Sequence, residues 1–252
     1  MPMTQTLTAI VRLTRLTFHL IDGLMVVRWR FPHFSAPQKS ARIQAWALDL
    51  LALLAIEVEV KGVPPAPGPV LLVANHISWL DIVLMLATCH CRFVAKSEIA
   101  RWPVLGLLTR AAGTLFIARD SPRDALRVVH HMAEELKSGA ILAVFPEGTT
   151  SNGLQLLPFH ANLFQAAISA NAPVQPVALQ FLAADTGQIS LAPCYIDDDT
   201  LFGSVWRTLT SPPLRASLTF GTPQPCNGRD RRTWAGEMRE SVASLLQSGR
   251  HA

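Results

Sequence analysis

Short runs rich in β-branched and aliphatic residues alternate with helical patterns along most of this chain of 252 residues. Such runs, bounded by glycine, proline or polar residues, predict strands, and apolar residues spaced three and four apart predict helices. We expect strands at residues 70–74, 92–95, 114–117, 141–145, 174–180 and 215–220, and helices at residues 80–87, 103–111, 123–137, 163–170 and 230–247. This order predicts an α/β fold, with a largely parallel or mixed central sheet flanked by helices.

The N-terminal segment differs from this pattern because it is both apolar and basic. Between residues 7 and 31, four polar residues follow one another at spacings of three, four and three, which places them on one stripe of a helix: Arg12, Arg15, His19 and Asp22. A second helical pattern covers about residues 40–56. The uninterrupted apolar runs are shorter than the roughly 20 residues that span a bilayer. We therefore predict two amphipathic helices that lie on a membrane rather than cross it.

Charge and composition favour a membrane surface for this segment. Half of the chain is hydrophobic and 16% is charged, and a basic surplus equal to the whole formal net charge of +4 lies within residues 1–50. Cations embedded among leucine, isoleucine and valine suit anionic lipid head groups better than a nucleic acid. Packing on the rest of the protein is the alternative, and it is stronger for the second helix. A proline-rich loop follows at residues 64–69, and we expect a docking segment at residues 1–60 and an α/β domain at residues 61–252.

The four cysteines favour neither a disulfide framework nor a metal centre. Cys89 and Cys91 are separated by one residue, Cys194 and Cys226 lie far along the chain, and the sequence has no Cys-x-x-Cys pair. Glycine-rich nucleotide-binding motifs and the His-Glu-x-x-His zinc motif are also absent from the sequence. We expect no metal, no resident cofactor and a reducing, cytoplasmic-side environment.

One histidine and one aspartate combine useful chemistry with a suitable position. His76 and Asp81 flank the turn between a predicted strand and a predicted helix, where α/β enzymes place their sites. If His76 precedes the helix, Asp81 can orient one imidazole nitrogen and leave the other to take a proton. The alternative is structural, because Ser78 and Asp81 have the spacing of a capping box, in which Asp81 would only satisfy a backbone donor.

Three further sequence blocks follow this pair in order. The four blocks are His-Ile-Ser-Trp-Leu-Asp at residues 76–81, Gly-Thr-Leu-Phe-Ile-Ala-Arg at 113–119, Phe-Pro-Glu-Gly-Thr at 145–149 and Val-Gln-Pro-Val-Ala at 174–178. In these blocks the chain resembles the glycerolipid acyltransferase family, typified by 1-acylglycerol-3-phosphate acyltransferase. Their joint order is more specific than any single block. The resemblance implies that His76 is the general base and that Asp81 orients it.

The resemblance also implies an acceptor-binding group. Arg119 would bind the acceptor head group, and Glu147, Gly148 and Thr149 would form part of the same pocket. A guanidinium suits a phosphate monoester because it can bind two oxygens at once. Lys96, at the end of a predicted strand, is a second candidate cation.

The implied reaction is acyl transfer from a thioester to the free hydroxyl of a lysolipid. The first acceptor that the resemblance suggests is 1-acyl-sn-glycerol-3-phosphate, which would give phosphatidic acid in phospholipid biosynthesis. The donor would be acyl-CoA or an acyl carrier protein thioester, and the other partners would be lipids at the cytoplasmic face of the inner membrane. The sequence has no Gly-x-Ser-x-Gly elbow, so we expect direct attack by the acceptor rather than an acyl-enzyme.

The chain departs from the family pattern at two places where a phosphate-binding cation is usual. Thr150 and Ser151 follow the third block instead of an arginine, and Phe-His-Ala-Asn at residues 159–162 replaces a Phe-Lys-x-Gly sequence. Both changes remove positive charge, which leaves a lyso-ornithine lipid or another lysolipid as the alternative acceptor. Two other classes of function stay open: a hydrolase that transfers the acyl group to water, and a membrane-binding scaffold without catalysis.

Overall fold

Seven strands form one central sheet in the computed structural model, which describes residues 3–117 and 122–249. The strands are β1 (Ile56–Lys61), β2 (Val70–Ala74), β3 (Arg92–Lys96), β4 (Leu115–Ile117), β5 (Ile141–Val144), β6 (Val174–Ala183) and β7 (Leu214–Phe220). The α-helices are α1 (Met3–Met25), α2 (Ala36–Leu53), α3 (Leu80–Thr88), α4 (Leu105–Ala111), α5 (Pro122–Lys137), α6 (Phe164–Ala170), α7 (Leu201–Thr210) and α8 (Arg231–Ser248). Where the sequence predicts an element after residue 60, the ends differ from these by three residues or fewer.

The order of strands across the sheet is β1-β7-β6-β2-β5-β3-β4. From β6 to β4 each neighbouring pair is parallel, whereas β7 pairs antiparallel with β6 and parallel with β1. The sheet is therefore mixed, and the predicted α/β fold is confirmed. Because β2, β3, β4 and β5 point the same way, the residues at their carboxyl ends share one edge of the sheet.

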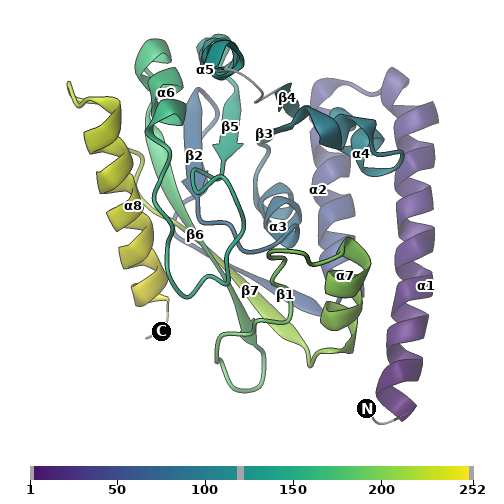
Figure 1. Ribbon diagram of the computed structural model, residues 1–252. Helices are drawn as coiled ribbons and strands as arrows, with labels where there is room; N and C mark the ends of the chain where they lie inside the picture. Colours follow the sequence, from purple (N-terminus) through teal and green to yellow (C-terminus); the bar gives the residue numbers. More distant parts are fainter. Residues whose placement is uncertain (1–2, 118–121, 250–252) are drawn as a thin grey trace.

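Helices cover both faces of the sheet (Figure 1). Alternate residues of β2 face opposite layers: Leu72 and Ala74 pack in the cluster that contains α2 and α3 residues, and Leu71 and Val73 pack in the cluster that contains α5, α6 and α8 residues. Both sides of β2 are buried, which explains its unbroken apolar sequence. In Figure 1, α1 and α8 lie at opposite flanks of the molecule.

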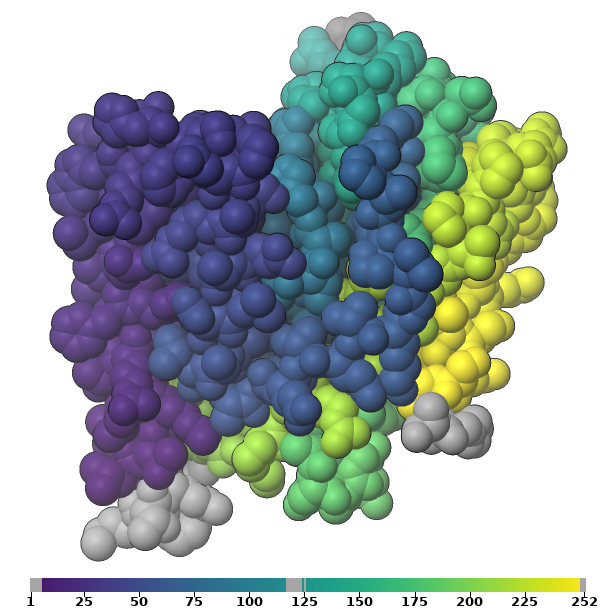
Figure 2. Space-filling view, turned by 180° about the vertical axis from the view of Figure 1, so that it is seen from behind, coloured from purple at the N-terminus to yellow at the C-terminus, as the bar shows by residue number. Residues whose placement is uncertain are grey.

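Two long helices precede the sheet. α1 has 23 residues and continues into a π-helical turn (Val26–Arg30) and a 3₁₀ turn (Phe31–His33). α2 then begins after Ser35, whose hydroxyl accepts from the Gln38 N–H at 3.4 Å while the Gln38 side chain accepts from the Ser35 N–H at 2.8 Å. Figure 2 shows the two helices forming one flank of the molecule. Within the described ranges, no helix is long and apolar enough to span a membrane.

The polar stripe predicted on the first helix turns partly inward. His19 stacks on Trp46 of α2 with ring centroids 5.0 Å apart, and Asp22 pairs with Arg42 of α2 at 2.5 Å. Large apolar side chains of α1 and the turn after it are left exposed: Leu7, Ile10, Val11, Phe18, Ile21, Met25 and Trp29. α2 packs on α3, so the second helix belongs to the body of the protein. Docking of the exposed surface on a membrane stays a prediction.

The sequence patterns do not predict β1 and α7. The apolar helical pattern in the sequence continues to Ile56. In the structure α2 ends at Leu53, because Ala55 adopts a left-handed backbone with φ of 56°, and β1 starts at Ile56. β1 pairs with β7, and its alternating sequence suits an edge strand with one exposed face. α7 is short and begins after Thr200, whose hydroxyl accepts from the Gly203 N–H at 3.1 Å. The division into residues 1–60 and 61–252 stays a prediction, and β1 crosses it.

Candidate active site

His76 and Asp81 meet at the carboxyl end of β2. His76 lies in the turn before α3, and its Nδ1 is 2.8 Å from Oδ2 of Asp81 in the first turn of α3. The Asp81 side chain is fully buried, whereas 19% of the His76 side chain is exposed. A carboxylate can only accept here, so Nδ1 carries the proton. Nε2 is then the nitrogen that can take a proton from a substrate.

Carboxylates bind three successive N–H groups of the turn that carries His76. The His76 N–H donates to Glu147 at 2.8 Å. The N–H groups of Ile77 and Ser78 donate to Oδ2 of Asp81 at 2.6 and 2.9 Å. Asp81 therefore fills both roles that the sequence leaves open, since one oxygen caps the start of α3 and also holds the imidazole. The N-terminal end of the helix dipole further favours its negative charge.

The carbonyl groups of the same turn are bound from two distant loops. The His76 carbonyl accepts from the Ser151 N–H at 2.9 Å, and the Ile77 carbonyl accepts from the Tyr195 N–H at 3.1 Å. Just before the turn, the Asn75 side chain bonds both backbone groups of Leu179 on β6, at 2.8 and 3.0 Å. With its backbone satisfied from all sides, the turn holds His76 in one geometry before any substrate arrives.

Aromatic rings fix the plane of the imidazole. The His76 ring lies flat on Phe145, with centroids 3.9 Å apart and an interplanar angle of 8°. Phe145 in turn stacks on Phe93 of β3 at 5.9 Å. This apolar support limits rotation of the histidine ring. In the sequence, Phe145 is visible only as the first residue of the third block.

Glu147 faces the backbone of the protein. It is 4% exposed, and its two oxygens accept from the N–H groups of His76 at 2.8 Å and Leu157 at 2.9 Å. Burial raises the pKa of the Glu147 carboxyl above its ordinary value, although these two donors act in the opposite direction. The described contacts of Glu147 therefore position the turn that carries His76, and its expected contact with the acceptor stays a prediction.

Gly148 and Thr149 are exposed directly after Glu147. Gly148 has a left-handed φ of 75°, and a Cβ there would lie 2.9 Å from the His160 imidazole, so a larger residue would be strained. Within the described ranges, the N–H groups of Thr149 and Thr150 have no hydrogen-bond partner. Free amides of this kind can stabilise an oxyanion. At the start of α3, the amides of Ile77, Ser78 and Leu80 are already occupied.

Lys96 is the predicted head-group cation that lies within the described part of the chain. Lys96 is exposed at the carboxyl end of β3, on the same edge of the sheet as His76 and Glu147. It is paired in register with Ile117, the last residue of β4. Arg119 lies outside the described residues. The structure therefore brings together His76, Asp81 and Glu147. Lys96 lies at the same edge of the sheet.

Known proteins share sequence with the part of the chain that carries this site. The family model described as Acyltransferase matches residues 55–180, which contain Glu147 and the whole turn that carries His76. The chain belongs to the acyltransferase family. It is 36% identical to a lyso-ornithine lipid O-acyltransferase of Pseudomonas aeruginosa, over 94% of this chain and 93% of that protein.

Other relatives carry a different name. This acyltransferase is 40% identical to a 1-acyl-sn-glycerol-3-phosphate acyltransferase of Neisseria gonorrhoeae, over 78% of this chain and 77% of that protein. Among solved structures it is similar to the 1-acyl-sn-glycerophosphate acyltransferase PlsC from Thermotoga maritima, with a TM-score of 0.66 over 94% of this chain and 98% of that one. At 23% identity, that likeness shows the fold. The expected family and enzyme class are confirmed.

Two residues of the acyltransferase that replace the usual arginine bind protein backbone instead. The Thr150 hydroxyl donates to the Tyr195 carbonyl, and the Ser151 N–H donates to His76 as described above. Together these two contacts connect the loop at residues 189–199 to the turn that carries His76. The sequence does not single out Tyr195 or Asn75, because their partners are distant in sequence. Tyr195 acts through its own backbone groups, and the Asn75 side chain binds the backbone of Leu179.

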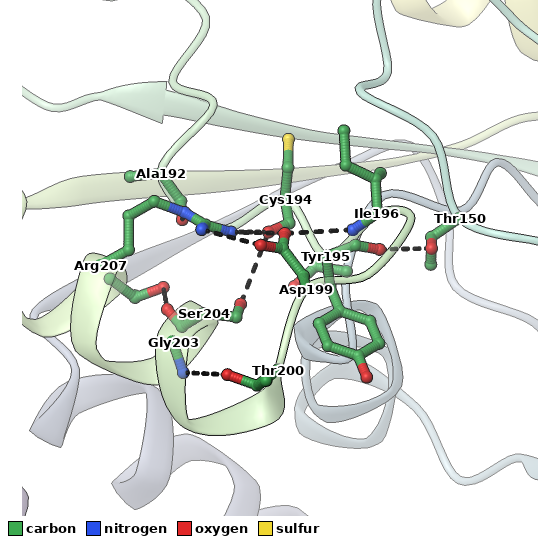
Figure 3. Close-up of polar contacts among 12 residues, drawn as sticks. Thr150, Ala192, Cys194, Tyr195, Ile196, Asp199, Thr200, Gly203, Ser204 and Arg207 are labelled. Atoms are coloured by element: carbon green, nitrogen blue, oxygen red, sulfur yellow. Dashed lines mark hydrogen bonds and ion pairs between the residues drawn. The ribbon is translucent and has the colours of Figure 1, made fainter.

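A cavity of about 460 Å³ lies beside this loop of the acyltransferase. Its lining residues are Asn152, Leu191, Cys194, Ile196, Asp197, Asp198, Asp199 and Arg207. Arg207 binds both oxygens of Asp199 at 2.9 and 3.2 Å and donates to the carbonyls of Ala192 and Cys194 (Figure 3). The hydrogen bonds from Arg207 lower the pKa of the Asp199 carboxyl below its ordinary value. Arg207 is therefore committed to holding the cavity wall.

The chemistry of the site favours direct acyl transfer. Burial, together with the nearby charge of Asp81, raises the pKa of the Cys194 thiol to about 11. Such a thiol is protonated at neutral pH, which makes it a poor nucleophile. Among the described residues, no group of three or more His, Cys, Asp or Glu side chains could hold a metal ion. The arrangement offers a base, an orienting carboxylate and free backbone donors.

Proposed function

We propose that this acyltransferase moves a fatty acyl group from an acyl-CoA or acyl carrier protein thioester to the free hydroxyl of 1-acyl-sn-glycerol-3-phosphate, giving phosphatidic acid. The contact that carries the proposal is the 2.8 Å bond from Nδ1 of His76 to buried Asp81, which leaves Nε2 to act as the base. The relatives of that name and the position of Lys96 at the same sheet edge support the acceptor. Arg119 is proposed as a further head-group cation.

In the proposed reaction, Nε2 of His76 takes the proton of the acceptor hydroxyl while the oxygen attacks the thioester carbonyl. The resulting imidazolium is stabilised by Asp81, and the oxyanion by the amides of Thr149 and Thr150. Collapse of the tetrahedral intermediate breaks the carbon–sulfur bond. The leaving thiolate takes the proton from His76, so the products are the new ester and a free thiol, and the enzyme returns to its starting state.

The reaction is proposed to take place at a membrane surface, at the cytoplasmic face of the inner membrane. Residues 1–60 would dock there, because α1 and the turn after it expose seven large apolar side chains next to Arg28 and Arg30. An apolar surface beside arginines fits the boundary between acyl chains and anionic head groups. Membrane lipids and the lysolipid acceptor would then reach the site from the bilayer.

A lyso-ornithine lipid is the second candidate acceptor. The relative matched over 94% of this chain carries that name. Thr150 and Ser151, which stand where the family pattern has a cation, bind protein backbone instead. The exposed carboxylates of Asp197 and Asp198 on the cavity wall also suit the ammonium of an ornithine head group better than a phosphate.

Transfer of a labelled acyl group in lipid vesicles tests the proposal. We would compare wild type, His76→Ala and the matched control His90→Ala, an exposed histidine away from the turn, with each acceptor and each thioester donor. We expect His76→Ala to lose transfer while it still floats with vesicles, and His90→Ala to behave as wild type. Undiminished transfer by His76→Ala would overturn the catalytic assignment. A higher kcat/KM for the lyso-ornithine lipid would move the acceptor assignment to the second candidate.

A further inference from the structure

An arginine on the C-terminal helix is connected to the catalytic histidine through three successive contacts. Arg239 of α8 donates from Nη2 to the Leu156 carbonyl at 2.6 Å and from Nε to the Leu157 carbonyl at 3.0 Å. The Leu157 N–H donates to one oxygen of Glu147 at 2.9 Å, and the other oxygen accepts from the His76 N–H at 2.8 Å. We propose that Arg239 is a positioning residue, which acts through Leu157 and Glu147 to fix the place of His76.

The residue type suits this task. A guanidinium presents several N–H groups in a rigid fork, so Arg239 can hold two successive carbonyls at once, whereas a lysine ammonium is a single point on a flexible chain. Across the described part of the protein, Arg239 forms no ion pair with a carboxylate. Its charge is directed at the backbone of one loop instead. Arg239 is half-buried, which limits competition from water.

α8 is a firm support for this contact. Its buried face includes Trp234, Met238 and Val242, and its last turn is tied to β6 by a 3.0 Å bond from the Gln180 side chain to the Leu246 carbonyl. The long segment between β5 and α6 has little regular structure of its own, and it runs beside α8 in Figure 1. Apolar contacts of Leu156 with this layer keep the segment docked. Arg239 therefore sets the fine position of a loop that is already held.

The catalytic consequence rests on the proposed role of His76 as the base. If the two guanidinium hydrogen bonds of Arg239 are lost, Leu157 can shift. Glu147 then loses one of its two donors, and the His76 backbone is less well fixed. Misplacement of a catalytic group by about 1 Å can cost as much as 10² in rate. Since the contacts lie on the protein side of His76 and not at a substrate, the loss is expected in kcat rather than in KM.

Four variants of the full chain test the assignment: Arg239→Gln, Arg239→Lys, Glu147→Gln and the double variant Arg239→Gln with Glu147→Gln. Arg232→Gln is the matched control, because Arg232 is an exposed arginine on the same helix. Two measurements are needed. Amide hydrogen exchange of the peptides that contain His76 and Leu157 reports the position of the loop without any substrate, and steady-state kinetics report kcat and KM for the acceptor.

We expect Arg239→Gln to speed exchange at His76 and Leu157 and to lower kcat about tenfold with KM unchanged. Arg239→Lys should recover part of both effects, and the double variant should lose little beyond Glu147→Gln, since both changes break one connected path. Exchange and kcat equal to those of Arg232→Gln, or fully additive losses in the double variant, would overturn the proposal. If wild type transferred no acyl group, the proposed function would fail, and the exchange comparison would still decide the role of Arg239.

Discussion

Replacement of Asp81 by asparagine is the most direct probe of the catalytic pair. In wild type a single oxygen, Oδ2, accepts from the imidazole and from the N–H groups of Ile77 and Ser78, and the side chain is fully buried. In Asp81→Asn the amide oxygen can keep those contacts. Its NH2 group then takes the place of Oδ1, a buried atom with no partner among the described residues. The variant therefore loses the negative charge and buries a donor without an acceptor.

The expected losses follow from these contacts. Removal of one member of a buried charge pair costs about 3–5 kcal/mol. In the proposed reaction the imidazolium forms during transfer, so this cost falls on the transition state. At 1.36 kcal/mol for each tenfold change, kcat should fall roughly 10² to 10⁴-fold. The unsatisfied amide should also lower the free energy of unfolding by about 1–3 kcal/mol.

Labelled acyl transfer at saturating acceptor, together with urea unfolding followed by circular dichroism, measures both effects. Asp49→Asn makes the same chemical change at an exposed carboxylate of α2 and is the control. Assays are run where both variants are folded, so that lost activity is not lost protein. If folded Asp81→Asn kept kcat within threefold of Asp49→Asn, Asp81 would be only the cap of α3, and the reasoning on the pair would be refuted.

Three other outcomes are expected. Leu72→Ala, at a fully buried position of β2, should lower the free energy of unfolding measured in urea by about 2–5 kcal/mol. Leu126→Ala, at a residue that is 71% exposed on α5, should change it by less than about 0.5 kcal/mol. Similar values for the two variants would contradict the two-layer core. With a pKa of about 11, the Cys194 thiol should react with iodoacetamide at pH 8 more slowly than Cys226, and Cys194→Ser should keep transfer activity; loss of transfer would point to an acyl-enzyme. Because burial raises the pKa of Glu147 above 4.5, its contribution to stability is fully present below that pH and is lost as the pH rises through the raised value. The advantage of wild type over Glu147→Gln should therefore shrink from pH 4 to pH 7 in urea unfolding, and parallel profiles would exclude this role of burial.

The predicted fold agrees with the structure wherever one segment carries its own pattern. β2 is apolar on both faces because helices cover both of its sides, so its sequence alone marks a buried strand. β1 was harder to predict, since its start depends on the left-handed backbone at Ala55 and on pairing with β7, more than 150 residues later. Side-chain periodicity does not show where a helix is ended by a residue with a left-handed backbone.

The N-terminal helix shows the same limit. The spacing of Arg12, Arg15, His19 and Asp22 predicts a polar stripe, and the helix exists as expected. Spacing fixes which residues share a face, but not which way the face points. Contacts of His19 and Asp22 with α2 decide that, and they leave apolar residues outward.

For the site, local sequence determined the pair and tertiary structure determined everything that holds it. His76 and Asp81 are five residues apart, so a turn followed by a helix start is enough to bring them together, and the block pattern marks them. Glu147, Ser151, Tyr195 and Arg239 reach the same turn, directly or through Leu157, from 70 or more residues away. These contacts involve backbone N–H and carbonyl groups, which nearly every residue has. The sequence therefore does not show which residue a given group will bind. Only the folded chain decides which backbone each of them meets.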